Sequence, residues 1–396
     1  MPDSNSPGYA RRLREIQPFK VMKLLARANA LQAAGHHVVH MEVGEPDFPT
    51  PQPIVEAGVA ALLAGQTKYT PAQGIPQLRE ALARHYADEY AVNVDPARIF
   101  ITAGGSGALL LCSALLLNPG EGLLMTDPGY PCNRHFLKAF SGEGQLVPAT
   151  AADDYQLSCA SVAAHWQAST RGALLASPAN PTGALIDEAE LVALAAYIRQ
   201  RGAYLVVDEI YHGLTYGATR PCSVLAIEPN AFVVNSFSKY FGMTGWRLGW
   251  LVVPEAAVPE VEKLAQNLFI CPSSIAQYAA LAAFTPRARD IMEQQREAFA
   301  GRRDFLVPAL RDLGIGVARL PEGAFYVYGS LPAWLADSEA FSQHALENYH
   351  VAATPGTDFG FYRANEHMRF SYAQPLDVLA TGVDRLRLAL DSFVPA

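Results

Sequence analysis

The sequence predicts an α/β fold in which a mostly parallel central sheet has helices on both faces, with a smaller, discontinuous α+β domain beside it. From about residue 75 to 270, short apolar and partly β-branched runs alternate with longer helical segments, and the runs end in polar residues. Continuous apolar strands of this kind are typical of parallel sheets covered on both faces. The C-terminal third instead combines a long helical stretch with a few strands, which predicts the second domain.

Five apolar runs are predicted to form strands of the large sheet, at residues 98–102, 122–127, 172–177, 203–209 and 231–237. Helical segments separate them, and 186–202 is the best example. Asp187 and Glu188 stand in its first turn, where carboxylates favour helix formation, and Gly202 follows its end.

Ligands of open α/β sheets bind outside the carboxyl ends of the strands. Asn180, Asp208 and Lys239 follow or end predicted strands at this edge. The reaction site is therefore predicted there.

The smaller domain is predicted to be discontinuous. A long helix over 287–313 precedes its strands, and the N-terminal segment, with a helix near 20–35, is expected to pack against it. The expected division assigns residues 1–46 and 286–396 to the small domain and 47–285 to the large one.

Composition excludes several classes of protein. Of the 396 residues, 50% are hydrophobic and 17% are charged, which rules out a disordered or fibrous chain. The net charge of −8 argues against nucleic acid as the main partner. Five cysteines without a C-x-x-C pair fit a reducing cytoplasm better than a disulfide framework or a zinc site.

Neither a signal peptide nor a membrane span is expected. The N-terminus has basic residues with no apolar core after them. The longest apolar stretch, 107–117, has about half of the roughly 20 residues that cross a bilayer. A soluble, cytoplasmic protein without a membrane partner is therefore expected.

Lys239 is one of only six lysines, and it follows an apolar strand among Phe237, Tyr240 and Phe241. Aromatic neighbours solvate an ammonium group poorly, so its pKa is expected to be lowered and the neutral amine favoured. A neutral amine suits a nucleophile that forms a Schiff base. Taken alone, the pattern also fits a lysine that snorkels from a strand end.

Asp208 ends an apolar run, where a carboxylate is costly to bury without a cationic partner. Such a residue can also be a helix cap or a metal ligand. Glu209 and His212 are not at a recognisable ligand spacing, so no metal site is predicted. Asn180 lies in the segment SPANPTG, where a structural Asx-turn is the alternative to a binding role.

A glycine-rich turn, TAGGSGALL (102–110), follows the first strand and opens a helix, so its backbone N–H groups can bind a phosphate. A dinucleotide fingerprint would need Gly or Ala where Leu110 stands. A nucleophile elbow centred on Ser106 would need glycine where Ala108 stands. A phosphate cradle without either motif is predicted.

In their order along the chain, the motifs resemble those of class I/II aminotransferases, pyridoxal-5′-phosphate enzymes of the aspartate aminotransferase fold (fold type I). The motifs are YTPAQG, AGGSGAL, DPGYP, NPTG, DEIY, SFSK…GWRLGW and R-F-S. The resemblance extends from VGEPDF (43–48) to MRFSYA (368–373), nearly the whole chain. It implies that fold, aminotransferase activity, pyridoxal 5′-phosphate as cofactor and a two-fold homodimer with composite sites.

The resemblance also implies a role for each matching residue around the cofactor ring. Lys239 would hold the cofactor as a Schiff base and, once the substrate frees it, would move the proton at the substrate Cα. Asp208 would keep the ring nitrogen protonated. Asn180 and Tyr211 would hydrogen-bond the ring oxygen, and Tyr130 would stack on the ring.

Further roles concern the cofactor phosphate and the substrate. The phosphate would be bound by Gly105, Ser106, Ser236, Ser238 and Arg247. Tyr69 would reach the phosphate of the neighbouring subunit. Arg369 would grip the substrate α-carboxylate, with Gly44 and Asn180 assisting, so that the Cα–H bond stands perpendicular to the ring.

The substrate prediction rests on missing cations. An enzyme strict for dicarboxylates needs a second cation, yet residues 264–286 contain no Lys or Arg and the glycine-rich turn carries Ser106 instead. An apolar side-chain pocket could be lined by Phe19, Phe269, Ile270 and Phe325. The sequence predicts a broad or apolar amino-acid donor, with glutamate or 2-oxoglutarate as the other partner. Lys20, Lys23 and Arg134 stay open as alternative cations.

Two other functions stay open. A β-lyase acting on sulfur amino acids, or an α-oxoamine synthase, would keep the same lysine, aspartate and arginine; release of ammonia or thiol without an amino acceptor would identify the lyase. A non-catalytic, cofactor-binding regulator module is the other alternative, although no basic helix-turn-helix extension stands before Gly8.

Overall fold

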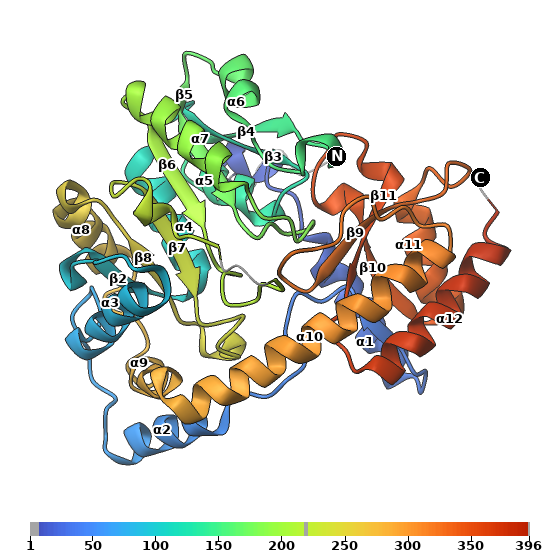
Figure 1. The fold of residues 1–396 in the computed structure, drawn as a ribbon, viewed down its shortest axis with the longest axis horizontal. Coiled ribbons are helices and arrows are strands. Elements are labelled where there is room, and N and C mark those ends of the chain that lie inside the picture. Colours follow the sequence, from blue (N-terminus) through green and yellow to red (C-terminus); the bar gives the residue numbers. More distant parts are fainter. Residues whose placement is uncertain (1–7, 218–220, 395–396) are drawn as a thin grey trace.

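The computed structural model describes residues 8–217 and 221–394, which form two sheets with surrounding helices (Figure 1). The larger sheet has seven strands in the order β2-β8-β7-β6-β5-β3-β4. Neighbours from β7 to β4 are parallel, whereas β8 runs antiparallel to both β7 and β2. The strands are β2 (Ile99–Thr102), β3 (Gly122–Asp127), β4 (Glu143–Pro148), β5 (Thr170–Ala176), β6 (Tyr204–Asp208), β7 (Phe232–Ser236) and β8 (Gly249–Val252). The predicted mostly parallel sheet is confirmed, while β4 and β8 were not predicted.

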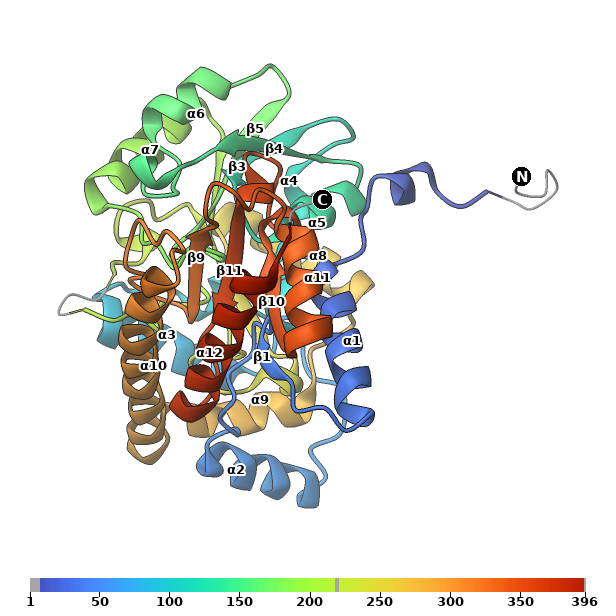
Figure 2. The same ribbon diagram turned by 90° about the vertical axis from the view of Figure 1, so that its right-hand side faces the viewer.

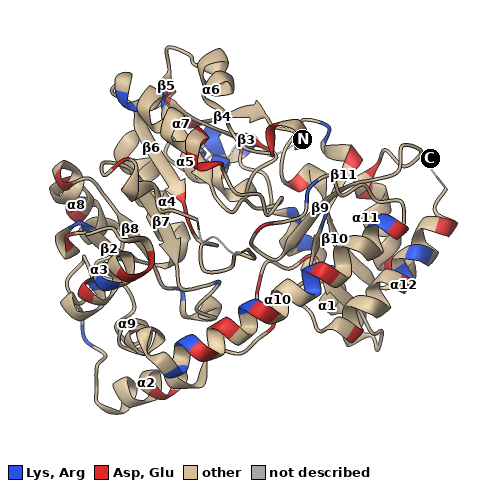
Figure 3. Ribbon diagram, in the orientation of Figure 1, with Lys and Arg blue, Asp and Glu red and all other residues tan. Residues whose placement is uncertain are grey.

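Both faces of the large sheet are buried. Leu205 and Val207 of β6 pack into one core and Val206 packs into another, because successive side chains point to opposite faces. The first core is closed by α2 (Gln52–Leu63), α3 (Pro76–Tyr90), α6 (Cys159–His165), α7 (Glu188–Gln200) and α9 (Ser274–Leu281). The second is closed by α4 (Gly104–Leu116), α5 (Pro131–Ala139) and α8 (Val258–Leu268). Charged residues are sparse along the strands and stand near their ends (Figure 3).

The smaller sheet joins the two ends of the chain. Its order is β1-β10-β11-β9, and β1 pairs in parallel with β10 while the other pairs are antiparallel. The strands are β1 (Val39–Met41), β9 (Tyr326–Ser330), β10 (Val351–Pro355) and β11 (His367–Ser371). The division into residues 1–46, 47–285 and 286–396 stays a prediction, and residues 1–7 and 395–396 lie outside the described chain.

Helices from both ends of the chain pack around the smaller sheet (Figure 2). They are α1 (Lys20–Ala33), α10 (Pro286–Asp312), α11 (Ser338–Tyr349) and α12 (Leu376–Ser392). The long helix α10 contacts α2 at one end and β9 and α12 farther along. It therefore joins a helix that covers the large sheet to the smaller sheet and its helices. Within residues 8–217 and 221–394, no helix is long and apolar enough to cross a bilayer.

Candidate active site

A cavity of about 300 Å³ lies where the carboxyl ends of β5, β6 and β7 face the smaller sheet. Twelve of the thirteen predicted site residues line it, and Tyr69 is the exception. The twelve are Gly44, Gly105, Ser106, Tyr130, Asn180, Asp208, Tyr211, Ser236, Ser238, Lys239, Arg247 and Arg369. The structure therefore brings together residues that are separated by more than 300 positions in the chain.

Lys239 lies in the turn after β7, and its side chain lines this cavity. Its Nζ donates to the Gly44 carbonyl at 2.5 Å. Burial lowers the pKa of Lys239 to about 8, and the charge of Arg369 acts in the same direction. The unprotonated amine, which is the reactive form of a nucleophile, is therefore more populated near neutral pH than that of an ordinary lysine.

The predicted direction of the Lys239 pKa shift agrees with the structure, but the aromatic neighbours differ. The Tyr211 and Phe325 rings each lie 5.7 Å from Nζ. Phe237, next to it in sequence, packs instead against Trp250 in the core, with ring centroids 5.0 Å apart. Residues 237–240 form a turn after β7, in which neighbouring side chains need not share a direction, so adjacency in sequence was a poor guide to contact.

Asp208 is the last residue of β6 and is buried. One carboxylate oxygen accepts the Ile210 N–H at 3.1 Å. Burial raises the pKa of Asp208 to about 6, although the Ile210 hydrogen bond and the nearby charge of Lys239 favour the ionised form. A buried carboxylate of this kind is stabilised by a cationic or protonated ligand in the cavity.

The neighbouring Glu209 has a different environment. Its carboxylate accepts hydrogen bonds from the Ser223 hydroxyl and from the Val224 N–H at 2.8 Å, so it holds the following loop. Burial raises the pKa of Glu209 to about 8. Throughout the described part of the chain, no group of three or more His, Cys, Asp or Glu side chains could hold a metal ion.

Arg369 and Asn180 are hydrogen-bonded to each other and also line the cavity. Arg369 is only 2% exposed, and its Nη1 donates to Asn180 Oδ1 at 3.0 Å. Its Nη2 donates to the Glu42 carbonyl, and its Cζ lies 4.3 Å from the centroid of the Tyr326 ring. The Arg369 Nε is buried with no hydrogen-bond partner in the described chain. A buried guanidinium with a free donor suits the binding of a carboxylate.

Tyr326 joins the site without having been predicted. Its hydroxyl lies 2.9 Å from that of Tyr211, and burial raises the pKa of both phenols. A Cβ at Gly44 would stand 2.6 Å from the Tyr326 hydroxyl, so glycine is needed there. Nothing in the run AFYVYG distinguishes Tyr326 from an ordinary strand residue.

The other end of the cavity is rich in hydrogen-bond donors. Helix α4 begins at Gly104, whose φ of +69° and 2.6 Å approach to the Arg247 guanidinium require glycine. The Ser236 and Ser238 hydroxyls lie 2.9 Å apart. Arg247 is exposed, and its Nη1 donates to the Thr244 carbonyl at 3.1 Å. A helix N-terminus, two hydroxyls and a guanidinium are an anion-binding set.

Some predicted residues lie elsewhere. Tyr69 is 81% exposed and is not part of this chain's cavity. Phe19 lines the cavity, but Phe269 and Ile270 do not. Phe325 is fully buried and stacks on Phe299 instead of lining the cavity wall.

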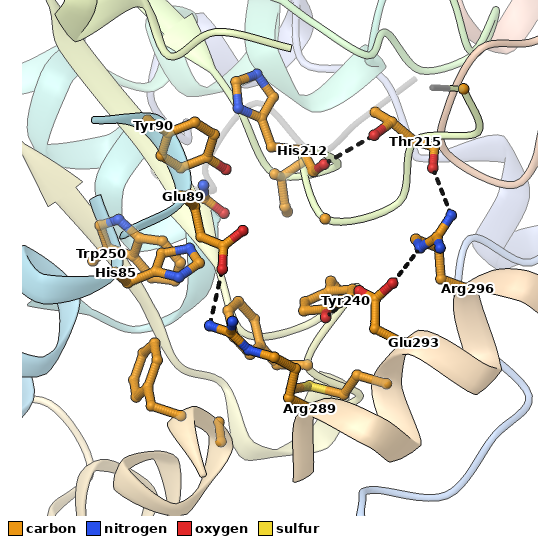
Figure 4. A pocket seen from close by; sticks show the side chains of 18 residues that line it. His85, Glu89, Tyr90, His212, Thr215, Tyr240, Trp250, Arg289, Glu293 and Arg296 are labelled. Carbon is orange, nitrogen blue, oxygen red and sulfur yellow. Dashed lines mark hydrogen bonds and ion pairs between the residues drawn. The ribbon is translucent and has the colours of Figure 1, made fainter. Parts of the chain in front are cut away.

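A second cavity of about 140 Å³ contains none of the predicted site residues (Figure 4). Its charged side chains pair with one another: Arg289 lies 2.9 Å from Glu89, and Arg296 lies 2.8 Å from Glu293. Arg296 also donates to the Thr215 carbonyl at 3.3 Å. The first pair connects α10 to α3, the second lies within α10, and the Thr215 contact holds α10 to the segment after β6, which is a structural role.

Known proteins resemble this chain over nearly its whole length. The family model for aminotransferase class I and II matches residues 36–386. A valine–pyruvate aminotransferase of Mycobacterium tuberculosis is 38% identical over 361 residues, which cover 91% of this chain and 93% of that protein. A probable aspartate/prephenate aminotransferase of Aquifex aeolicus is 34% identical and covers 98% of this chain and 99% of its own.

Solved structures agree with these matches. The crystal structure of an aminotransferase from Mycobacterium tuberculosis has a TM-score of 0.94 at 36% identity and covers 98% of this chain and 100% of its own. Aspartate aminotransferase from Thermus thermophilus with maleate has a TM-score of 0.92 at 32% identity, covering 97% and 100%.

The fold and the cavity thus define an enzyme that uses pyridoxal 5′-phosphate. The chain belongs to the class I and II aminotransferases. Both the resemblance and the fold type predicted from the sequence are confirmed.

The residues present fit this cofactor. Its phosphate is a dianion, which matches the donors around Arg247; its ring nitrogen can carry a proton, which matches the buried carboxylate of Asp208; and its carbonyl matches the partly neutral amine of Lys239. All three groups line one cavity. In the described chain, none of these groups belongs to a cluster of side chains that could bind a metal ion.

Proposed function

We propose that this aminotransferase takes its amino group from an L-amino acid with an apolar side chain and passes it to a 2-oxo acid. The cavity lining carries the proposal. Its only cations in the described chain are Lys239, Arg247 and Arg369, and each is needed for the cofactor or the α-carboxylate. Much of the remaining wall is apolar and consists of Phe19, Val21, Met22, Leu25, Val43, Leu109 and Ile210.

The alternative cations considered from the sequence bind elsewhere. Lys20 Nζ forms an ion pair with Glu339 and donates to the Thr357 hydroxyl at 3.0 Å. Arg134 donates to the Asp358 carbonyl at 3.3 Å. Neither of them lines the cavity, and Lys23 does not either. A distal carboxylate would therefore be buried without a partner, which is costly.

The choice of acceptor follows the same argument. The sequence predicted glutamate or 2-oxoglutarate as the second partner, and 2-oxoglutarate carries a distal carboxylate. Pyruvate carries none, and the name of the valine–pyruvate relative joins an apolar donor to this acceptor. Pyruvate is accordingly the acceptor that the cavity favours, and 2-oxoglutarate is the one to compare with it.

In the proposed reaction, the bound cofactor supplies the electron sink for the carbanion at the substrate Cα. Lys239 would hold the cofactor through its ε-amine and would move the proton at the substrate Cα. Asp208 would hold a proton at the ring nitrogen. Arg369, positioned by Asn180, binds the α-carboxylate in two places and so orients the Cα–H bond.

The remaining site residues support the cofactor in this proposal. Tyr211 and Asn180 would hydrogen-bond the ring oxygen, Tyr130 would stack on the ring, and Gly44 would assist Arg369. The phosphate would be bound by Gly105, Ser106, Ser236, Ser238 and Arg247. Together these contacts would fix the ring relative to the Lys239 amine.

We also propose a two-fold homodimer in which Tyr69 reaches the phosphate of the neighbouring site. The 81% exposure of this large side chain supports a role outside its own chain. A cytoplasmic location is supported by five free cysteines, which fit a reducing compartment. A sedimentation measurement that gave only monomer for the holoenzyme would contradict the dimer.

A panel of amino donors tests the proposed function. With pyruvate as acceptor, kcat/KM for valine or leucine is expected to exceed that for aspartate at least about thirtyfold, because about 2 kcal/mol is lost when a carboxylate meets an apolar wall. Equal turnover of aspartate would contradict the donor class. Release of ammonia or thiol without an acceptor would instead indicate a lyase.

The pH dependence of cofactor binding tests the state of Lys239. Only the neutral amine attacks a carbonyl, and with a pKa of about 8 its neutral fraction rises about tenfold between pH 7 and 9 and then levels off. The rate at which apo-protein regains cofactor absorbance is expected to follow this curve. A lysine of ordinary pKa would give a rate that rises about a hundredfold over that range without a plateau.

A further inference from the structure

Helix α1 is capped by a residue from the far end of the chain. Its N-cap residue, Phe19, provides no side-chain hydrogen bond. The N–H groups of Lys20 and Val21 instead donate to the two carboxylate oxygens of Asp358, at 3.0 and 3.3 Å. Asp358 is 3% exposed and lies 338 positions after Lys20. A carboxylate at this end of a helix satisfies free N–H groups and interacts favourably with the helix dipole.

The capped end of α1 is also the end that lines the active-site cavity. Phe19, Val21, Met22 and Leu25 contribute to its wall. Because Asp358 holds the first two N–H groups of the helix, it sets where these four side chains stand. They form much of the apolar wall that the proposed donor side chain would contact.

The segment that carries Asp358 is fixed to the large sheet. Asp127, the last residue of β3, accepts the Phe361 N–H with both oxygens at 3.0 Å and the Tyr362 N–H at 3.1 Å. A Cβ at Gly360 would lie 1.7 Å from Asp127 Oδ1, so only glycine fits. These hydrogen bonds hold the segment that carries Asp358 against the end of β3.

The same segment touches the residue expected to bind the α-carboxylate. The Phe359 ring centroid lies 4.7 Å from Arg369 Cζ. One short loop therefore contacts two parts of the donor site. Asp358 binds the helix α1, which carries the apolar wall, and Phe359 packs against the Arg369 guanidinium on β11. The loop is held at one end by the hydrogen bonds of Asp358 and at the other by those of Asp127.

We propose that Asp358 is a positioning residue for the amino donor: by capping α1 it holds the apolar wall at the distance from Arg369 that a branched aliphatic side chain fills. The proposal rests on the donor class given above. Asp358 itself contacts neither substrate nor cofactor. Its loss changes how tightly apolar donors bind, not how the cofactor is held.

The test compares Asp358→Ala with Asp337→Ala in the holoenzyme. Asp337 is exposed and caps α11 by accepting the Ala340 N–H at 3.0 Å, and it does not line the cavity, so its removal tests the loss of a helix cap that leaves the cavity wall untouched. Asp358→Ala is expected to raise the KM for valine about tenfold, since two hydrogen bonds to a charged group are lost. The kcat and cofactor absorbance stay unchanged, and the KM for alanine rises less than twofold.

Asp337→Ala is expected to leave both KM values within twofold of wild type. If Asp358→Ala does not fold, Asp358→Asn replaces it, because its amide oxygen keeps one acceptor, and a KM rise for valine of about threefold is expected. The proposal is overturned if the variant that folds has a wild-type KM for valine, if Asp337→Ala has the same KM effect, or if cofactor is lost. Failure of the wild-type enzyme to prefer valine over aspartate contradicts the proposed function instead, whatever the variants do.

Discussion

Replacing Lys239 with alanine is expected to lower aminotransferase activity at least about 10⁴-fold, because the variant loses both the amine that attaches the cofactor and the group that moves the proton at Cα. Among the residues that the structure describes, Lys239 is the only lysine that lines the cavity. The fold should survive, since the change removes a buried amine whose charge is already disfavoured, as its pKa of about 8 indicates. Steady-state kinetics with valine and pyruvate, together with circular dichroism, measure both effects.

Lys263→Ala is the matched control. Lys263 lies on the surface of α8 and pairs with Glu260 at 2.6 Å. Exposed pairs of this kind contribute little to stability, so the control is expected to keep activity within twofold of wild type. More than about 1% of wild-type activity in Lys239→Ala would show that another group does the proton transfer.

Replacing Asp208 with asparagine is expected to lower kcat/KM about 10³-fold and to weaken cofactor binding. Asparagine has nearly the same shape but no charge, so it cannot hold a proton at the ring nitrogen. Removing one partner of a buried charge pair costs about 2–5 kcal/mol. Activity assays and the cofactor absorbance that remains after gel filtration measure the two losses.

Asp187→Asn provides the comparison for this variant. Asp187 caps α7 by accepting the Ala189 and Glu190 N–H groups, and asparagine caps a helix about as well as aspartate. Its activity and cofactor content should match those of wild type. Retention of cofactor and of full activity by Asp208→Asn would contradict the role given to Asp208.

The sequence was informative about the large sheet where its strands are buried on both faces. β3 and β6 are apolar along their length and were predicted within a residue or two. β4 was not predicted, because it is an edge strand whose residues Glu143–Leu146 are all half-buried and form no apolar run. β8 was missed although all of its residues are buried, because a run of only four residues is too short to distinguish a strand from another buried segment.

The site was predictable where a motif carries the chemistry. Asp208 and Lys239 were placed together because strands of a parallel sheet end at one edge. The hydroxyl pair of Tyr211 and Tyr326 and the capping of α1 by Asp358 were not predictable. Each joins segments more than 100 positions apart, and although the DEIY motif marks Tyr211, no local pattern marks Tyr326 or Asp358.

Covalent attachment of the cofactor at Lys239 is the central claim, and one measurement tests it most directly. The holoenzyme is reduced with borohydride, which makes an imine bond permanent, and its peptides are analysed by mass spectrometry. The cofactor mass is expected on the peptide that contains Lys239 and on no peptide that contains one of the other five lysines. Label on a different lysine, or no label on a protein that shows cofactor absorbance, would contradict the account.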